Sequence, residues 1–108
     1  MKILNVSNTS IDIIDTNPLV QLEKLVISKT RIHELKTAAL GCLKLLYMDD
    51  TDISELNVSN LKNLEELAVA RTKIARLDLT RMPKLLKVWG CTDSGRVVLT
   101  AEGVERYE

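Results

Sequence analysis

The chain has 108 residues, and its fifteen basic and fifteen acidic side chains give a formal net charge of zero. This length allows one domain, and the neutral balance argues against a nucleic-acid or anionic-membrane partner, because such partners usually require a basic excess. Phe is absent, with one Trp and two Tyr present, so the aromatic platforms that bind single-stranded nucleic acid are not expected either.

The N-terminal segment does not resemble a signal peptide. Its first residues, MKILNVSNTS, contain no apolar run of the required length, because Asn5 and Asn8 interrupt the apolar residues. No stretch of the chain is apolar for long enough to span a membrane. The segment instead begins a periodic pattern, with apolar side chains at Met1, Leu4, Val6, Ile11, Ile14 and Leu19.

The same pattern then repeats every 21 residues. Copies start at residues 1, 22, 43, 64 and 85, and the three central ones share the spelling LxxLxΦxxTxIxxL, where Φ is Ile, Met or Val. A constant period of this size is typical of a solenoid in which each repeat packs on its neighbours. The expected core columns include Leu22, Leu25, Ile27, Ile32 and Leu35, with Leu43, Leu46, Met48, Ile53 and Leu56 in the next copy and Leu64, Leu67, Val69, Ile74 and Leu77 after that.

Each repeat is expected to contain one short strand followed by irregular backbone. Positions 4 to 8 of the repeat alternate apolar and variable side chains, as a half-buried strand does, and successive strands would stack in parallel. About seven residues remain for the outer side of each coil, too few for a helix of ordinary length. Pro18 and Pro83 fall there, and proline removes a backbone donor. We therefore expect extended or 3₁₀-like segments on the convex side.

A polar column is expected at position 9, which is Thr9, Thr30, Thr51 and Thr72, with Asp93 in the fifth copy. A threonine hydroxyl has one donor and two acceptor sites that could satisfy the turn after the strand. Buried polar groups are nearly always hydrogen-bonded, so we interpret these threonines as a buried, hydrogen-bonded column. The alternative is a small polar residue that is merely tolerated.

The pattern breaks after Asp93. We expect five repeats over residues 1–94 and a capping tail over 95–108, because the terminal units of a solenoid need a polar outer face. Val98 or Leu99 would then cover the apolar end of the last repeat.

Three segments carry a resemblance to leucine-rich repeat proteins. LNVSNLKNLEEL (56–67) and LDLTRMPKLLKV (77–88) look like the repeat phrase of bacterial tandem arrays, of the short 21-residue class. LGCLKLLYMDDTDI (40–53) is similar to leucine-rich repeats of protozoan parasites, and both lineages stay open. The resemblance implies a leucine-rich repeat solenoid with a parallel sheet of about five short strands on its concave face. It also implies protein–protein recognition on that face, with no catalytic residues and no cofactor.

The centre of the concave face should carry position 5, which is Asn5, Val26, Tyr47, Ala68 and Trp89. Aromatic side chains in such a column are expected to be binding anchors. In the alternative interpretation the C-terminal tail covers Trp89, and Tyr47 is an ordinary exposed aromatic, since scattered apolar side chains are normal on surfaces.

Charged side chains alternate in sign next to this column. Position 8 runs Asn8, Lys29, Asp50, Arg71 and Thr92, and position 10 runs Ser10, Arg31, Asp52, Lys73 and Ser94. They could form a recognition patch, with Asp49 adding acidic charge, but the alternation favours pairing between neighbouring strands. The candidate partner-binding residues are therefore Val26, Tyr47, Asp49, Asp50, Arg71 and Trp89.

Catalytic and metal chemistry is not expected. His33 is the only histidine, a metal site needs three or four converging ligands, and no phosphate-loop, dinucleotide or HExxH motif occurs. Cys42 and Cys91 are expected to be too far apart for a disulfide. Free thiols favour a cytoplasmic location, although a secreted protein whose signal peptide had been removed would look the same.

These observations predict a non-catalytic module that binds a protein or peptide on its concave sheet. One alternative is a self-assembling or structural solenoid segment, because the first strand has no visible cap and a bare strand edge invites pairing with another chain. The chain could equally be a fragment of a longer array, or a regulatory domain of a larger protein. The sequence does not identify the partner.

Overall fold

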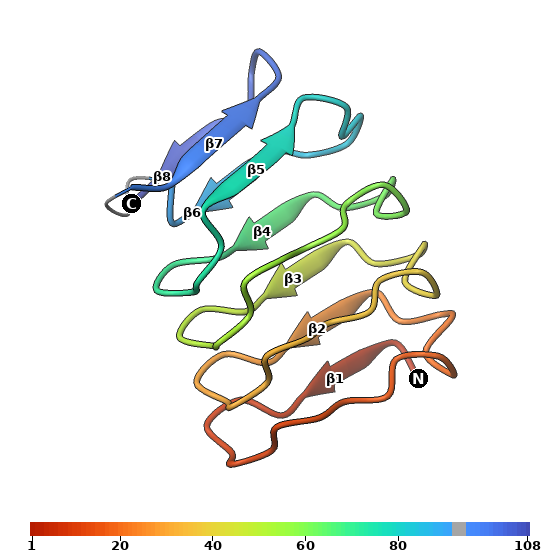
Figure 1. Ribbon diagram of the computed structural model, residues 1–108. Coiled ribbons are helices and arrows are strands. Elements are labelled where there is room, and N and C mark those ends of the chain that lie inside the picture. The colour runs from red at the N-terminus through yellow and green to blue at the C-terminus, as the bar shows by residue number, and fades with distance from the viewer. Residues whose placement is uncertain (92–94) are drawn as a thin grey trace.

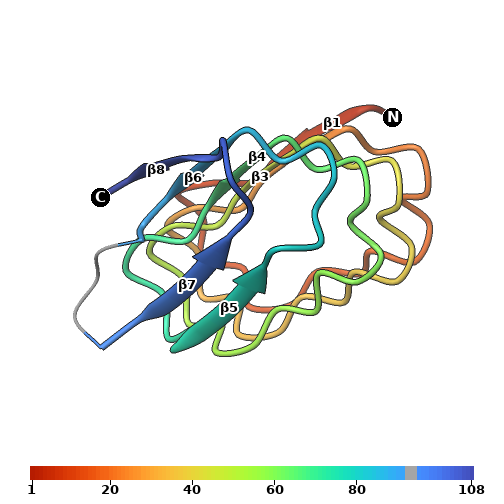
Figure 2. The same ribbon diagram turned by 90° about the horizontal axis from the view of Figure 1, so that it is seen from above.

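The computed structural model describes residues 1–91 and 95–108, and in it the chain winds into a solenoid of parallel strands (Figure 1). Six strands form one parallel sheet in the order β1-β2-β3-β4-β6-β8, and two more, β5 and β7, pair on the opposite side of the coils (Figure 2). The bounds are β1 Ile3–Asn5, β2 Lys24–Val26, β3 Leu45–Tyr47, β4 Glu66–Ala68, β5 Arg76–Leu79, β6 Lys87–Trp89, β7 Val97–Thr100 and β8 Glu105–Tyr107. No helix occurs in the described part of the chain. The predicted parallel solenoid is confirmed.

The strand register follows the 21-residue period and builds the core. Leu4 pairs with Leu25, Leu25 with Leu46, and so on to Val88 on β6. Leu25, Leu46 and Leu67 are completely buried, and each such side chain contributes about 1.5–3 kcal/mol on burial. The other expected columns also lie in the core, where the buried members include Ile27, Ile32, Leu40, Leu43, Met48, Ile53, Leu61, Leu64, Val69, Ile74 and Leu77.

We call the six-stranded sheet the concave side of the coils and the opposite side the convex side. Consecutive tight turns form the convex side. In the second coil, the Leu40 amide donates to the Thr37 carbonyl at 3.0 Å, and the Leu43 amide donates to the Leu40 carbonyl at 3.1 Å. Such three-residue spacings are typical of tight turns rather than of an α-helix. The convex side is therefore extended backbone joined by turns.

The concave strands are shorter than predicted, covering positions 3 to 5 of each repeat rather than 4 to 8. The expected span is wrong because position 8 takes a left-handed backbone, with φ of 60° at Asn8, 59° at Lys29, 58° at Asp50 and 55° at Arg71. That conformation ends a strand, and among these residues Asn8 and Asp50 are of types that tolerate it, whereas Lys29 and Arg71 are not. Backbone pairing between coils nevertheless continues past the strands, because the Lys29 amide donates to the Asp49 carbonyl at 2.9 Å.

The predicted hydrogen bonds of the threonine column are confirmed in the four coils where it is described, but the predicted burial holds only in two, since Thr9 is exposed and Thr72 is half-buried. The hydroxyls of Thr9, Thr30, Thr51 and Thr72 each donate to the carbonyl three residues earlier, over 2.6 to 2.9 Å. Thr30 and Thr51 are buried. Asp93, the fifth member, lies outside the described residues. The hydroxyls therefore close the left-handed turn from inside the coil.

Replacing Thr30 with valine is expected to destabilise the protein by about 1–2 kcal/mol, because the Ile27 carbonyl then loses its buried donor. The Ile32 amide, 3.4 Å from the Thr30 hydroxyl, loses an acceptor as well. Urea denaturation followed by circular dichroism measures the change, with Thr30→Ser as the control that keeps the hydroxyl. Equal stability of the valine variant and the native protein would contradict the role of the column.

A second threonine column on the convex side was not anticipated. The hydroxyls of Thr16 and Thr37 donate to the carbonyls of Lys36 and Asn57 in the following coil, both at 2.6 Å. Both threonines are buried. Later coils place Val58 and Leu79 at this position, and at Leu79 the β5–β7 backbone pair joins the neighbouring coils instead. The sequence feature that could have predicted this column is the recurrence of Thr at position 16 of the first two repeats.

Residues 95–108 continue both sheets: β7 completes a shortened fifth coil, and β8 begins a sixth. β7 keeps the period, since Val98 pairs with Leu77, but β8 pairs Glu105 with Lys87, a step of 18 residues. Val98 is 4% exposed and Leu99 is 38% exposed, so Val98 joins the core. The concave sheet therefore has six strands rather than about five. The proposed division into five repeats over 1–94 and a cap over 95–108 stays a prediction.

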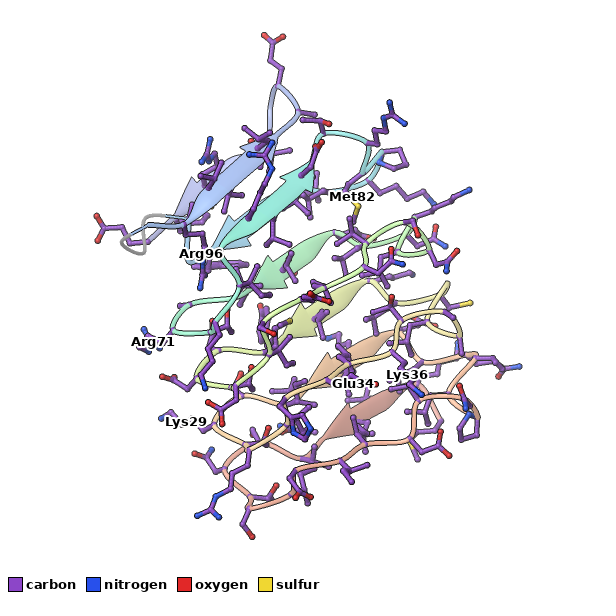
Figure 3. All side chains as sticks on the ribbon, viewed as in Figure 1. Lys29, Glu34, Lys36, Arg71, Met82 and Arg96 are labelled. Carbon is purple, nitrogen blue, oxygen red and sulfur yellow. The ribbon has the colours of Figure 1, made fainter. Side chains whose placement is uncertain are left out.

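The Arg96 side chain joins the fifth coil to the fourth (Figure 3). Its guanidinium donates to the carbonyls of Val69, Thr72, Ile74 and Gly90 and to the Thr72 hydroxyl. The planar fork of five donors suits this set of acceptors, which a single ammonium group could not reach together.

Candidate functional site

An aromatic row lies on the concave face of the sheet. Strand register places Tyr47, Ala68, Trp89 and Tyr107 side by side on β3, β4, β6 and β8. The Tyr47 and Trp89 rings have centroids 5.9 Å apart and are nearly perpendicular, at 81°. The Trp89 and Tyr107 rings stack at 5.3 Å and 18°. We call Tyr47, Trp89 and Tyr107 the aromatic row.

The sequence analysis found two members of this row and missed Tyr107. Tyr107 lies 18 residues after Trp89 instead of 21, so the repeat period does not point to it. The remaining sequence signal for Tyr107 was weak, because it consists only of an aromatic residue between the charged Arg106 and Glu108. The tail therefore extends the row beside Trp89.

Ala68 lets the rings of Tyr47 and Trp89 meet. β4 separates their strands, and strands in a sheet lie about 4.8 Å apart, so the two rings can touch only over a small side chain. Ala68 is only 4% exposed although its column faces the concave side, because the rings lean over it. An edge-to-face pair of this kind contributes about 0.5–1.5 kcal/mol.

The rings border a concave hollow of about 350 Å³. Its lining residues are Tyr47, Asp49, Ala68, Ala70, Arg71, Trp89 and Glu108. Four of the six residues proposed from the sequence, Tyr47, Asp49, Arg71 and Trp89, thus meet here. Val26 lies on the next strand beside Tyr47, outside the lining. Asp50 lies in the turn after β3 and lines a second, more open surface instead.

Asp49 is held in place at the wall of the hollow. Its carboxylate accepts the Ala70 amide at 2.8 Å, so the side chain bridges from the third coil to the fourth. It is half-buried. A carboxylate fixed by a backbone donor presents its charge at a defined point of the hollow.

The alternating charges form pairs between adjacent turns. Arg71 binds Asp50 through two contacts, Nε to Oδ1 at 2.6 Å and Nη2 to Oδ2 at 3.0 Å, and this hydrogen bonding lowers the pKa of the Asp50 carboxyl. Lys73 lies 3.5 Å from Asp52 in the same way. Figure 3 shows Lys29 and Arg71 along the edge of the stack where the concave strands end. Thr92 and Ser94, at the next positions of the same columns, lie outside the described residues.

Carboxylates lie at the hydroxyl ends of the two tyrosines in the aromatic row. The Tyr47 hydroxyl donates to a Glu66 carboxylate oxygen at 3.4 Å, and the Tyr107 hydroxyl donates to Glu105. Burial raises the pKa of the Tyr47 hydroxyl, and the negative charges of Glu66 and Asp49 raise it further. Each tyrosine hydroxyl of the row therefore ends at a carboxylate, and Lys87 lies in register between Glu66 and Glu105.

No other chemistry-bearing cluster stands out. His33 is exposed, and no group of three or more metal-ligating side chains occurs among residues 1–91 and 95–108. Both cysteines are described and neither forms a disulfide, Cys42 being exposed and Cys91 buried. Cys91 falls within positions 4 to 8 of the fifth repeat, where the sequence predicted a strand. It instead follows the end of β6, and its thiol donates to the Val88 carbonyl at 3.7 Å. The same described residues contain no helix that could cross a membrane.

Comparison with known proteins supports the fold. No family model matches the chain, and no curated protein sequence matches it. Among solved structures, the functional domain of InlJ from Listeria monocytogenes, which includes a cysteine ladder, superimposes with a TM-score of 0.80 and 19% identity. The match covers 95% of this chain and 25% of that one, so the present chain spans about a quarter of that structure's length. The chain is a repeat protein with the parallel β-solenoid fold that this domain also has.

Proposed function

We propose that the chain belongs to the leucine-rich repeat family, in its 21-residue class, and acts as a non-catalytic module that holds a protein or peptide on its concave sheet. The observation that carries the proposal is the aromatic row beside the concave hollow. The proposed contact residues are Val26, Tyr47, Asp49, Asp50, Arg71 and Trp89, together with Tyr107.

The position of the rings argues for recognition rather than for packing. They lie on the face of the sheet opposite the buried leucines and stay partly exposed, with Tyr107 at 39%. Tyr and Trp are enriched in protein interfaces and among the residues that dominate binding energy. Because ring contacts and backbone pairing already fix these side chains, a partner would lose little binding energy in ordering them.

A non-catalytic role fits the lining of the hollow. Its seven described residues include no histidine, cysteine, serine or threonine, so the described part of the lining offers no nucleophile with an adjacent base. The charged side chains are instead suited to orienting a bound partner.

Alanine substitution in the aromatic row tests the proposal. Peptides selected from a random library on the native chain are expected to lose about tenfold or more in affinity for Tyr47→Ala and for Trp89→Ala. Ile13→Ala is the matched control, because Ile13 is 76% exposed and lies outside the sheet. If the peptide affinity were unchanged in both aromatic variants, the peptides would bind elsewhere, and the aromatic row would not be the binding site.

Self-association is the second candidate, and the exposure of the first coil favours it. β1 is an edge strand, and Met1 and Ile3 are 74% and 61% exposed. The apolar columns that are fully buried in later coils begin there with half-buried Leu4 and Val6. A second copy pairing along β1 would cover these groups. Light scattering after size exclusion should then show concentration-dependent dimers that Ile3→Lys disrupts, whereas a monomer at every concentration would exclude this candidate.

A further inference from the structure

Six charged side chains cross the coils just beyond the ends of the concave strands, at positions 8 and 10 of the repeat. The second coil supplies two cations, the third coil two carboxylates and the fourth coil two cations. Figure 3 shows two of them, Lys29 and Arg71, along the edge of the stack. We call these six residues the charge row: Lys29, Arg31, Asp50, Asp52, Arg71 and Lys73. Four cations and two carboxylates leave the row with a net charge of +2.

The carboxylates of the charge row bind the cations of the fourth coil. Asp50 accepts two hydrogen bonds from Arg71, and the Asp52 carboxylate lies 3.5 Å from the Lys73 amine. Hydrogen bonding from Arg71 is the main reason that the pKa of the Asp50 carboxyl is lowered, and the charge of Lys29 lowers it further. These pairs explain the alternation of sign between the third and fourth coils, but they do not use the cations of the second.

The cations of the second coil have no carboxylate beside them toward the first coil. Lys29 and Arg31 are exposed, and neither side chain forms an ion pair or a hydrogen bond with another described residue. Asn8 and Ser10, at the same positions of the first coil, are uncharged. The excess positive charge of the row therefore lies at the second coil.

The backbone joins the first two coils in the same way as the third and fourth. The Asn8 amide donates to the Ser28 carbonyl at 3.0 Å, as the Asp50 amide donates to the Ala70 carbonyl at 2.9 Å. Asn8 and Asp50 also share a left-handed φ, of 60° and 58°. A carboxylate beside Lys29 would therefore have the setting that Asp50 has in the third coil, but the first coil does not supply one.

An open depression of about 1150 Å³ lies over this part of the charge row. We call it the basic depression, and its lining includes Asn8, Ser10, Lys29, Arg31, Asp50 and Arg71. The amide of Asn8 and the hydroxyl of Ser10 can donate hydrogen bonds to an anion next to the cations. The basic depression adjoins the concave hollow, because Arg71 lines both.

We propose that the basic depression receives an acidic segment of the protein partner, whose carboxylates pair with Lys29 and Arg31. Arg31 suits such a partner, because a guanidinium can bind a carboxylate through two parallel hydrogen bonds. A basic segment would meet like charges there, and an apolar segment would remove water from two cations without giving them a partner. This inference rests on the proposed role in protein binding, and it does not require the aromatic row to be the binding site.

Short capped peptides titrated into the native chain test the charge of the occupant. Ac-Gly-Asp-Gly-Asp-Gly-NH2 carries two carboxylates on one side of an extended peptide, because side chains two residues apart share a face. Ac-Gly-Asn-Gly-Asn-Gly-NH2 is the neutral control. Amide NMR shifts at low salt give the affinity and locate the peptide. We expect the acidic peptide to shift Asn8, Ser10, Lys29 and Arg31, to bind at least about threefold more tightly than the neutral one, and to weaken as salt is added.

The first test variant completes the charge row within the chain. Asn8→Asp combined with Ser10→Asp places carboxylates beside the two cations of the second coil, at the repeat positions that carry aspartate in the third. These carboxylates should compete with the peptide and remove the preference for the acidic one. Asn60→Asp combined with Ser54→Asp is the matched control, since it makes the same two changes at exposed residues outside the basic depression. The control should bind as the native chain does.

The second test variant removes the cations. Lys29→Gln combined with Arg31→Gln should abolish the preference for the acidic peptide. Lys36→Gln combined with Arg76→Gln removes the same charge from exposed residues elsewhere on the coils and should keep the preference. The two test variants change the net charge in different ways but predict the same loss of binding, because each leaves the peptide without available cations or removes the cations themselves.

The outcomes separate this inference from the proposed function. Equal binding of the acidic and neutral peptides would overturn the acidic specificity, and shifts confined to another surface would overturn the position. A loss of preference as large in the control variants as in the test variants would reduce the effect to general surface charge and also overturn the inference. The response of library-selected peptides to Tyr47→Ala and Trp89→Ala tests the aromatic row separately, so either proposal can fail alone.

Discussion

Gly90→Ala is expected to destabilise the protein by about 3 kcal/mol, the first of the two largest effects that the structure predicts. Gly90 has φ of 94°, and a Cβ added there would lie 2.5 Å from the Ala70 nitrogen and 2.8 Å from its Cα. These are backbone atoms of the neighbouring coil and cannot rotate away. Forcing extra volume into a packed site costs about 1–3 kcal/mol, and a positive φ adds about 1 kcal/mol or more for a residue with a side chain.

The loss should appear first in the C-terminal coils. Trp89 precedes Gly90 in the chain, so its fluorescence reports on this region, while circular dichroism follows all the coils. In urea we expect the fluorescence midpoint to fall by more than the circular dichroism midpoint, because coils of a solenoid can open locally. Gly103→Ala is the matched control, since Gly103 also has a positive φ, of 90°, but nothing lies within 4 Å of its added Cβ. If both variants lost the same stability, contact with the Ala70 backbone would not be the cause.

Arg96→Ala is expected to cost about 2–4 kcal/mol. The change removes donors from the carbonyls of Val69, Thr72, Ile74 and Gly90 at once. Hydrogen bonds to charged groups contribute about 1.5–3 kcal/mol, and buried acceptors left without a donor add a penalty. Since the side chain joins the fifth coil to the fourth, its loss should also expose the apolar side chain of Val98.

Amide hydrogen exchange measures where the Arg96 variant opens. We expect protection to fall in β7 and β8 and to stay near native in β2 and β3, because each coil contacts only its neighbours. Arg96→Lys should recover only part of the stability, since an ammonium group lacks the planar fork. Arg76→Ala, at an exposed residue of β5, controls for loss of positive charge. Near-native exchange in β7 and β8 of Arg96→Ala would show that other contacts hold the last coil.

Part of the candidate site could be predicted from the sequence. Position 5 of the repeat placed Val26, Tyr47, Ala68 and Trp89 in one column, and the strand register confirms that order. The sequence could not show that Tyr47 and Trp89 touch over Ala68, because contact depends on rotamers and on the size of the residue between them. Nor could it show that Asp49 is fixed by the Ala70 amide, a bond between coils.

The sequence by itself determined the solenoid, its core columns and its threonine column. A strict period forces each apolar position to pack on its equivalent one coil away, so a pattern read along the chain becomes a column in space. The left-handed turns at Lys29 and Arg71 had no such signal, because those residue types do not favour positive φ. They are imposed by backbone pairing between coils and by the threonine hydroxyls beneath them.

Only the tertiary structure decided how the last coil closes. The step from β6 to β8 is three residues shorter than the repeat, 18 against 21, and that shortening brings Tyr107 onto Trp89. Gly90 and Arg96 make their decisive contacts with residues of the fourth coil, and the equivalent positions of the other repeats carry neither Gly nor Arg. Periodicity determines what recurs along a chain, whereas the closing coil depends on packing against a single neighbour, which no local pattern encodes.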